Sequence, residues 1–359
     1  MSFGLKSLVN SAKALAIGDS GSKASLGDLF PVVNKAADGD DCDHDCDSCV
    51  VQYPKNFKID EEDELYGFVK GWSTHVLVAT GKTDWVRDVA DEKGSVMQAI
   101  DGAKGPSNGR LMLSASNIPT PHHSSDYSEP TTVLLLPAFT IIENVTPATV
   151  PTLINEFINK APTNTAPLEP VSLPRALPAP LPEGTPAVLL ELTTRPCPHR
   201  ALILLCSQKT RDARCGQSAP LLRKELQRHL QPLGLYRDLD DERPGGVGIY
   251  FISHVGGHKY SANMMVYRRP DAFGLDNVER GKLSEGEKLI VSKKEMAAPA
   301  EGTAGGSDDV GAAQCIWLAR VRPEDCEGIV KFTVLQGKVV KPQRQLRGGF
   351  DRSKGLMSW

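Results

Sequence analysis

The pattern of apolar and polar residues from position 61 onward predicts strands and helices in alternation. Three short apolar runs bounded by polar, Gly or Pro residues predict buried strands over residues 75–80, 110–116 and 132–138. Residues 84–100 are expected to form a helix, and residues 147–160 an amphipathic helix, because their apolar positions recur at a helical period. The first part of the chain is therefore expected to be an α/β unit.

A second block begins near residue 187 and predicts the same kinds of element in the same order. We expect strands over residues 201–206, 247–252, 263–267 and 316–321, and helices over residues 219–230 and 323–334. The sequence of apolar strand, turn, proline and helix at residues 134–157 returns at residues 316–332. Self-similarity at this distance indicates a duplicated unit.

The segments around these blocks differ in composition. Residues 1–60 are polar and rich in Gly and Asp, and residues 161–186 hold eight prolines in 26 positions, which predicts an extended linker. The expected organisation is a disordered N-terminal segment with a Cys cluster (1–60), a first domain (61–160), the Pro-rich linker (161–186), a second domain with an insertion near 281–314 (187–340), and a flexible tail (341–359).

Charge and composition exclude some partners. The 359 residues include 41 Lys and Arg and 44 Asp and Glu, for a net charge of −3. Phosphate binding needs a basic surface, so we expect no nucleic-acid partner. No apolar run approaches the ~20 residues of a membrane helix, so we expect no membrane partner. The start has no secretory-signal pattern, which predicts a reducing compartment: cytoplasmic, with nuclear entry left open and a mitochondrial location less favoured.

Four residues of the second block have the chemistry and placement of metal ligands. Cys206 ends a predicted strand, Cys215 follows in the loop before a helix, and His254 and His258 flank Val-Gly-Gly after the next strand. Strand ends of one sheet can bring these two loops together. Thiolate and imidazole ligands suit zinc, and they also suit a [2Fe–2S] cluster in which two histidines replace two cysteines on one iron. Taken singly, each cysteine also fits a buried apolar position and each histidine a solvated loop.

The surrounding motifs resemble a known family. The second block is similar to a thioredoxin-like [2Fe–2S] ferredoxin in its two spaced cysteines, in the segment 317–325 with its Pro-Glu-Asp, and in Gly-Lys-Val-Val at 337–340. The run His-Val-Gly-Gly-His-Lys at 254–259 departs from that pattern and resembles the sucrase/ferredoxin-like family, including its fungal members. This resemblance implies two tandem thioredoxin-like α/β domains, the first a degenerate one without a cluster.

The resemblance also implies a function. Cys206 and Cys215 would hold one iron of a [2Fe–2S] cluster, and His254 and His258 the other. The chain would then be a non-Rieske, bis-histidinyl electron-transfer protein in cytosolic redox homeostasis, closer to an electron carrier than to an enzyme, with a reductase and an acceptor that the sequence does not name. Two neutral imidazoles in place of two thiolates raise the reduction potential. Their second ring nitrogens predict that electron uptake is coupled to proton uptake.

The last three residues, Met-Ser-Trp, resemble the terminal tripeptide by which the cytosolic iron–sulfur assembly machinery recognises its clients. We therefore expect Trp359 to direct the chain to that machinery.

Other cysteines and histidines leave alternatives open. Cys42, Cys46 and Cys49, with His44, could bind zinc or iron, and the pair Cys46 and Cys49 could act as a thiol oxidoreductase. A zinc-stabilised adaptor without a redox role is the other alternative. The pair at positions 197 and 199 is a less favoured set of ligands, and His229 is expected to be solvated on its helix. The motifs of nucleophilic hydrolases, P-loops and dinucleotide-binding folds are absent from the sequence.

Overall fold

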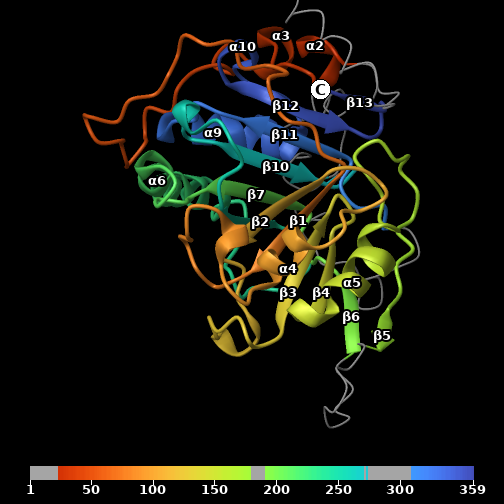
Figure 1. The fold of residues 1–359 in the computed structure, drawn as a ribbon. Helices are drawn as coiled ribbons and strands as arrows, with labels where there is room; N and C mark the ends of the chain where they lie inside the picture. The colour runs from red at the N-terminus through yellow and green to blue at the C-terminus, as the bar shows by residue number, and fades with distance from the viewer. Residues whose placement is uncertain (1–22, 179–190, 271, 274–308) are drawn as a thin grey trace, which may run out of the picture.

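The computed structural model describes residues 23–178, 191–270, 272–273 and 309–359. The strands of these residues form one mixed sheet of thirteen strands, in the order β13-β12-β11-β10-β7-β9-β2-β1-β3-β4-β6-β5, with β8 paired to β9. Helices pack beside the strands of both halves (Figure 1). The chain is thus a mixed α/β protein, as predicted.

Each half of the sheet has its own set of elements. The first half contains the strands β1 (Thr74–Ala79), β2 (Leu111–Ser116), β3 (Thr131–Leu136), β4 (Thr140–Val145), β5 (Ala176–Pro178) and β6 (Glu191–Pro196), with the helices α4 (Val96–Gly102) and α5 (Val150–Thr152), which continues as a π-helical turn over Leu153–Ile158. The second half contains the strands β7 (Ala201–Cys206), β8 (Tyr236–Arg237), β9 (Val247–Ile252), β10 (Met264–Arg268), β11 (Gln314–Leu318), β12 (Leu346–Asp351) and β13 (Leu356–Met357), with the helices α6 (Ala213–Leu230), α9 (Cys326–Gly328, continuing as a π-helical turn over Ile329–Val334) and α10 (Pro342–Gln345). Two short helices precede both halves, α2 (Leu26–Leu29) and α3 (Lys35–Asp38).

The two halves repeat one topology. The first strand of each (β1 and β7) pairs parallel with the second (β2 and β9) and antiparallel with the third (β3 and β10), which pairs antiparallel with the fourth. This order is consistent with a thioredoxin-like α/β fold. In both halves a proline opens a 3-10 turn that leads into a helix, Pro147 before α5 and Pro323 before α9, where its fixed φ suits a first turn. The strand that precedes this turn is β4 in the first half and β11 in the second. The predicted match of residues 134–157 with residues 316–332 is therefore wrong by one strand, because residue 134 lies on β3 and the counterpart of β11 is β4.

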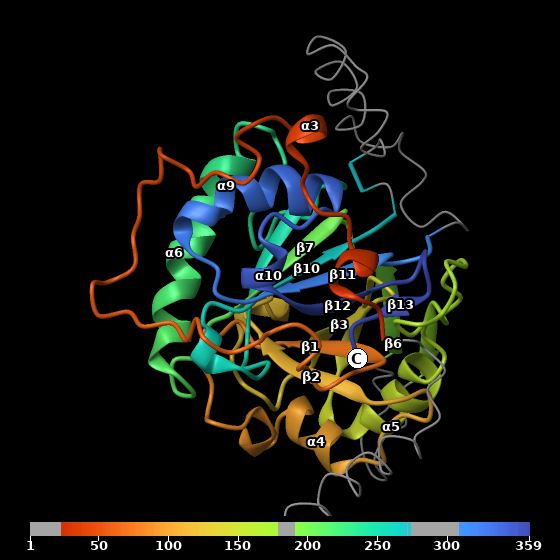
Figure 2. The same cartoon turned by 90° about the horizontal axis from the view of Figure 1, so that it is seen from above.

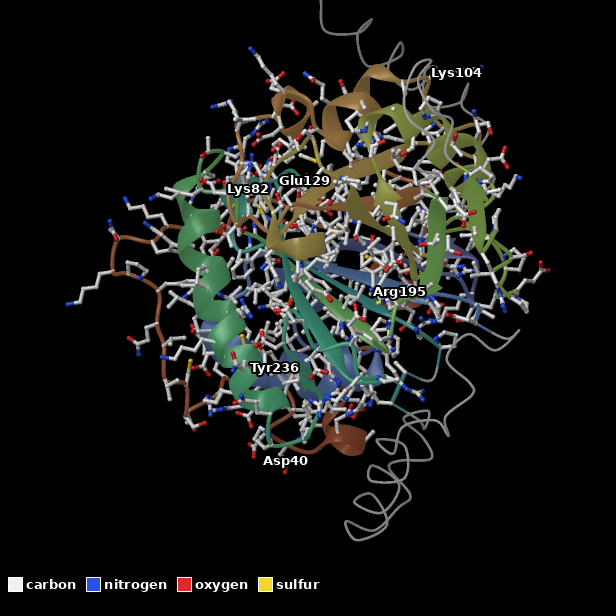
Figure 3. The ribbon with its side chains drawn as sticks, turned by 90° about the horizontal axis from the view of Figure 1, so that it is seen from below. Asp40, Lys82, Lys104, Glu129, Arg195 and Tyr236 are labelled. Atoms are coloured by element: carbon white, nitrogen blue, oxygen red, sulfur yellow. The ribbon has the colours of Figure 1, made fainter. Side chains whose placement is uncertain are left out.

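The halves meet at the centre of one sheet. Strands β2 and β9 pair through Ser116 and Ile252, and side chains extend the seam, since the Asn117 side-chain oxygen accepts from the Phe251 N–H at 2.7 Å. One face carries a single apolar core from both halves, with Trp72, Leu77, Met112, Leu134, Leu202, Met265, Trp317 and Phe350. On β6, Arg195 (Figure 3) contacts Glu143 of the first half at 2.8 Å and Glu242 of the second at 2.6 Å. A division into two separate domains is therefore not confirmed.

The expected flexible tail is wrong. Residues 346–351 form β12, which pairs antiparallel with β11, and Phe350 is fully buried. The terminal indole of Trp359 is half-buried and lies against Trp72, with ring centroids 4.3 Å apart. The basic and Gly-rich composition of residues 341–359 predicts a flexible tail. The glycines instead fit the sheet, because a Cβ on Gly349 would collide with the carbonyl of Cys315 on β11.

The expected N-terminal segment, linker and insertion are each described only in part. Residues 1–22 of the expected disordered segment lie outside the described residues, whereas residues 23–60 are placed and bridge to the second half at Lys23–Met357 and Val32–Val339. Residues 161–178 of the expected linker include β5 and pack on the core of the first half, and the carbonyls of Ala166 and Pro167 also accept from Arg352 of the second half. Residues 179–186 of the linker and 281–308 of the insertion also lie outside the described residues.

Two helix boundaries differ from expectation. The helix predicted at 84–100 is confined to α4, because Gly94 takes a positive φ of 74° and Ser95 caps the helix by accepting from the Gln98 N–H at 3.1 Å. Helix α6 begins six residues earlier than expected, since Asp212 caps it and accepts from the Arg214 N–H at 2.9 Å. In the described part of the chain, no helix is long and apolar enough to cross a bilayer.

Candidate metal centre

The parallel strands β7 and β9 bring the predicted ligands to one edge of the sheet. Cys206 is the last residue of β7 and lies level with Ile252, the last residue of β9. His254 follows two residues later. Cys215 is the third residue of α6, not a loop residue as expected, so the helix fixes its position.

Three donor atoms converge at this edge. The sulfurs of Cys206 and Cys215 and a ring nitrogen of His254 all lie within 4.8 Å of one another. Both cysteines are buried, at 2% and 0% exposure. The Nδ1 atom of His254 is buried, and the described residues offer it no hydrogen-bond partner. Two buried thiols beside an imidazole nitrogen suit a metal or cluster, and the unpartnered Nδ1 shows that the hydrogen bonds of this ring are incomplete, which is costly for a buried group.

The fourth predicted ligand lies nearby but outside this group. His258 begins a 3-10 turn, is exposed, and has its ring centroid 5.3 Å from that of His254. The chain turns back between them because Gly256 and Gly257 take positive φ values of 88° and 65°. The structure thus brings both histidines to the same site, with only His254 in contact range of the sulfurs.

The two thiols share their protons unequally. The pKa of Cys215 is lowered to about 5, first because its sulfur hydrogen-bonds with Cys206 and then because of His254 and Ser261. The same hydrogen bond and burial raise the pKa of Cys206 well above its usual range. Cys215 also lies in the first turn of α6, where the helix dipole favours a thiolate. At neutral pH the pair therefore carries one negative charge, on the Cys215 thiolate, while Cys206 keeps its proton.

The loop that follows Cys206 is held from the first half. The Gln208 side-chain oxygen accepts from the His254 N–H at 2.8 Å, and its nitrogen donates to the Val86 carbonyl at 2.5 Å. The Ser207 hydroxyl donates to the Thr83 carbonyl at 2.7 Å. The first half carries no ligand of this centre in the described residues, but it holds the two ligand loops in place.

A buried arginine beneath the histidine loop was missed at the sequence level. Arg347 on β12 donates to the Gly256 carbonyl at 2.8 Å and to the Asn263 side-chain oxygen at 2.9 Å, and its guanidinium lies 4.4 Å from the Trp317 ring centroid. Burial lowers its pKa to about 10, and the charge of Cys206 acts in the opposite direction. Arg347 thus places a buried positive charge beside the site. Its sequence signal is the Arg-Gly-Gly at 347–349, which lies in the segment predicted to be a flexible tail.

The alternative ligands of the sequence are not brought to this centre. Cys197 and His199 precede β7, at the opposite end of the strand from Cys206. Burial raises the pKa of Cys197 to about 11, and His199 Nε2 bonds with the Tyr250 hydroxyl at 3.0 Å.

The N-terminal cysteines are not gathered with His44. Cys42 packs in an apolar cluster with Phe332 and Val340, and His44 is exposed. The Cys49 thiol donates to the Val51 carbonyl at 3.0 Å, and burial raises its pKa, which does not favour a nucleophile. Cys46 lies instead near His229, which is mostly buried and not solvated as expected.

Comparisons with known proteins identify the family of the chain. The sequence model of the sucrase/ferredoxin-like family matches residues 65–348. Actin patches distal protein 1 of Saccharomyces cerevisiae is 31% identical over 253 residues, which span 65% of this chain and 74% of the yeast protein. Altered inheritance of mitochondria protein 32 of Clavispora lusitaniae is 27% identical over 143 residues (40% of this chain and 33% of that protein), and that of Debaryomyces hansenii is 29% identical over 140 residues (39% and 33%). No solved structure matches the chain significantly. The chain belongs to the sucrase/ferredoxin-like family.

Proposed function

We propose that the chain is a [2Fe–2S] electron-transfer protein in which Cys206 and Cys215 hold one iron and His254 and His258 hold the other. The observation that carries the proposal is a buried pair of thiols whose sulfurs lie within 4.8 Å of each other and of a ring nitrogen of His254. Membership of a family described as ferredoxin-like supports a redox role. When bound, such a cluster takes up and releases one electron, and its two imidazoles raise its reduction potential relative to four thiolates.

The chain's own residues prepare the site for binding. Cluster binding requires both thiols to be deprotonated. Cys215 already meets that requirement, because its pKa is about 5, whereas Cys206 must release its proton to solvent. Arg347 partly balances the resulting negative charge. His258 is exposed, so its second ring nitrogen can exchange protons with water, which supports coupling between electron and proton uptake.

The same geometry favours one second candidate. Three donors within 4.8 Å of one another also suit a single zinc ion with an open fourth position. The chain would then be a zinc-stabilised adaptor without a redox role.

Metal content and spectra distinguish the two candidates. The full chain is purified without oxygen and assayed for iron, acid-labile sulfide and zinc, with optical and EPR spectra. We expect about two irons and two sulfides per chain, and a reduced EPR signal that changes in His254→Cys and His258→Cys. Cys215→Ser should lose the cluster. Cys197→Ser, a buried cysteine at the other end of β7, is the matched control and should keep it. Colourless protein that retains zinc at Cys206 and Cys215 after treatment with iron and sulfide would overturn the proposal.

The wider setting of the function is also proposed. We infer two tandem thioredoxin-like units, of which the first serves as a scaffold, and a cytoplasmic protein that receives its cluster from the cytosolic assembly machinery through Trp359. Its electrons would come from a reductase and pass to an acceptor, neither of which is identified. The repeated topology supports the first inference, and the ligand set together with the terminal Trp supports the second.

A further inference from the structure

A second set of metal-type donors lies away from the candidate centre. Donor atoms of Cys46, His229 and Glu327 lie within 4.8 Å of one another, and the Cys46 sulfur is 3.9 Å from His229 Nε2. The three residues come from distant parts of the chain: the N-terminal segment, the last turn of α6, and α9. Figures 1 and 2 show this N-terminal segment, in red and orange, running past α6 and α9.

The donor set has a defined chemistry. A thiolate, an imidazole and a carboxylate are together the ligand types of zinc, whereas calcium and magnesium require oxygen ligands only. Cys46 is buried, the His229 side chain is 13% exposed, and Glu327 is exposed, so the group is firmly placed on one side and open to water on the other. Cys46 also lines a cavity of about 470 Å³ beside the N-terminal segment.

The cationic side chain of Arg228 contacts two of the three donors. An Arg228 nitrogen lies 2.9 Å from His229 Nε2 and 3.5 Å from the Cys46 sulfur, and another contacts the buried carboxylate of Glu225 at 2.9 Å. A guanidinium can only donate, so His229 Nε2 is an acceptor with a lone pair directed at a cation. Arg228 is 31% exposed and can turn outward, which would leave the same lone pair and sulfur for a metal ion.

We propose that Cys46, His229 and Glu327 bind one zinc-class divalent cation, with water in the fourth position, and that this ion fastens the N-terminal segment to α6 and α9. Cys49 is not a ligand, because its thiol is directed to the Val51 carbonyl. His44 is also excluded, since its Nδ1 bonds with the Asp45 carbonyl at 2.7 Å and its ring is exposed. The proposed role is structural, because the ion crosslinks three segments far apart in sequence.

This site is distinct from the candidate cluster. His229 and Cys215 are fourteen positions apart on α6, a separation of about 21 Å along the helix axis. Loss of one metal therefore leaves the ligands of the other unchanged.

The test is zinc titration of the full, cluster-loaded chain under reducing conditions, in competition with a chromophoric chelator. We expect one tight zinc per chain. Cys46→Ser and His229→Ala should each weaken zinc binding by about 100-fold or more, since losing even the partner of a ligand costs 10–100-fold. Cobalt in place of zinc should show a thiolate charge-transfer band that is absent in Cys46→Ser. Added zinc should also protect the segment around residue 46 from limited proteolysis.

Matched variants give the test its controls. Cys49→Ser and His44→Ala remove the neighbouring cysteine and histidine of the same segment and should leave the zinc affinity unchanged. Arg228→Gln should raise it, because the competing cation is removed.

Two results would overturn the proposal: no stoichiometric zinc on the unmodified chain, or zinc that persists in both Cys46→Ser and His229→Ala. Zinc lost equally in Cys46→Ser and Cys49→Ser would indicate a different, two-cysteine site. Zinc lost in Cys206→Ser but not in His229→Ala would locate the ion at the first centre, which contradicts both this proposal and the proposed cluster. A cluster that fails to form while His229-dependent zinc persists would contradict the proposed function alone.

Discussion

A methyl group added at Gly257 should disrupt the histidine loop far more than the same change at another left-handed glycine. Gly257 takes a φ of 65°, and a Cβ there would collide with the Arg347 guanidinium. Gly355 takes a nearly equal φ of 63°, and nothing lies within 4 Å of its added Cβ. The two alanine variants therefore share the backbone strain and differ only in the collision.

The expected magnitudes follow from these contacts. Left-handed strain costs about 1 kcal/mol for alanine at either position. At Gly257, Arg347 must also move, and it gives up its hydrogen bonds to Gly256 and Asn263, at 2.8 and 2.9 Å. Bonds from a charged donor contribute about 1.5 kcal/mol each at the lower end, so Gly257→Ala should cost roughly 4 kcal/mol in total and Gly355→Ala about 1 kcal/mol.

The assay is chemical denaturation of both variants beside a measurement of bound iron. Gly257→Ala should lower the free energy of unfolding by the larger amount and reduce iron content, because the loop that carries His254 and His258 is displaced. Gly355→Ala should keep its iron. Equal destabilisation of the two variants, with iron unchanged in both, would refute the argument that Arg347 supports this loop.

Three further predictions concern charge, pH and the terminal indole. Arg347→Met should lower the reduction potential of the bound cluster, because a buried positive charge favours the reduced state; an unchanged potential by spectroelectrochemistry would contradict this. Burial lowers the pKa of His75 to about 3, and the unfolded chain binds that proton near pH 6.5. The contribution of neutral His75 is thus present above pH 6.5 and is lost as pH falls toward 3, by roughly 2 kcal/mol between pH 6.5 and 4.5. Denaturation against pH should show this loss, with a smaller slope in His75→Gln; an equal slope in this variant would contradict the assignment to His75. Trp359→Ala should lower cluster content in cells while reconstitution in vitro restores it; failure in vitro as well would show that the stacking on Trp72 matters more than recognition by the assembly machinery.

The local pattern predicted the strands better than the helices. Strands β7 and β9 were predicted with the bounds that they have, because they are continuously apolar and buried on both faces. Helix α6 was predicted to begin at residue 219, since its first six residues include Gly216 and Ser218 and have no apolar stripe. The helix instead begins at residue 213, because the Asp212 side chain caps it, and this capping contact depends on the position of that one side chain.

The sequence identified the candidate ligands, and the structure showed how they lie relative to one another. The types and spacing of Cys206, Cys215, His254 and His258 led to the family, which the comparisons confirm. Their roles as ligands stay a prediction, to which the structure adds the convergence of three donors and the unequal protonation of the thiols. No spacing rule could have found Arg347, because it reaches the loop from a strand more than 80 residues further along the chain.

The sequence by itself determined the repeated order of strands and helices, the residues with metal chemistry and the family. Periodicity, residue type and short spacings are local properties that survive in any fold. Only the tertiary structure decided that the two halves share one sheet, that the last residues complete it, and that Cys46 lies beside His229. The pairings of β2 with β9 and of Cys46 with His229 join segments more than 100 residues apart, and β12 reaches β11 across 28 or more residues. All three are selected by burial of complementary surfaces, which no local pattern encodes.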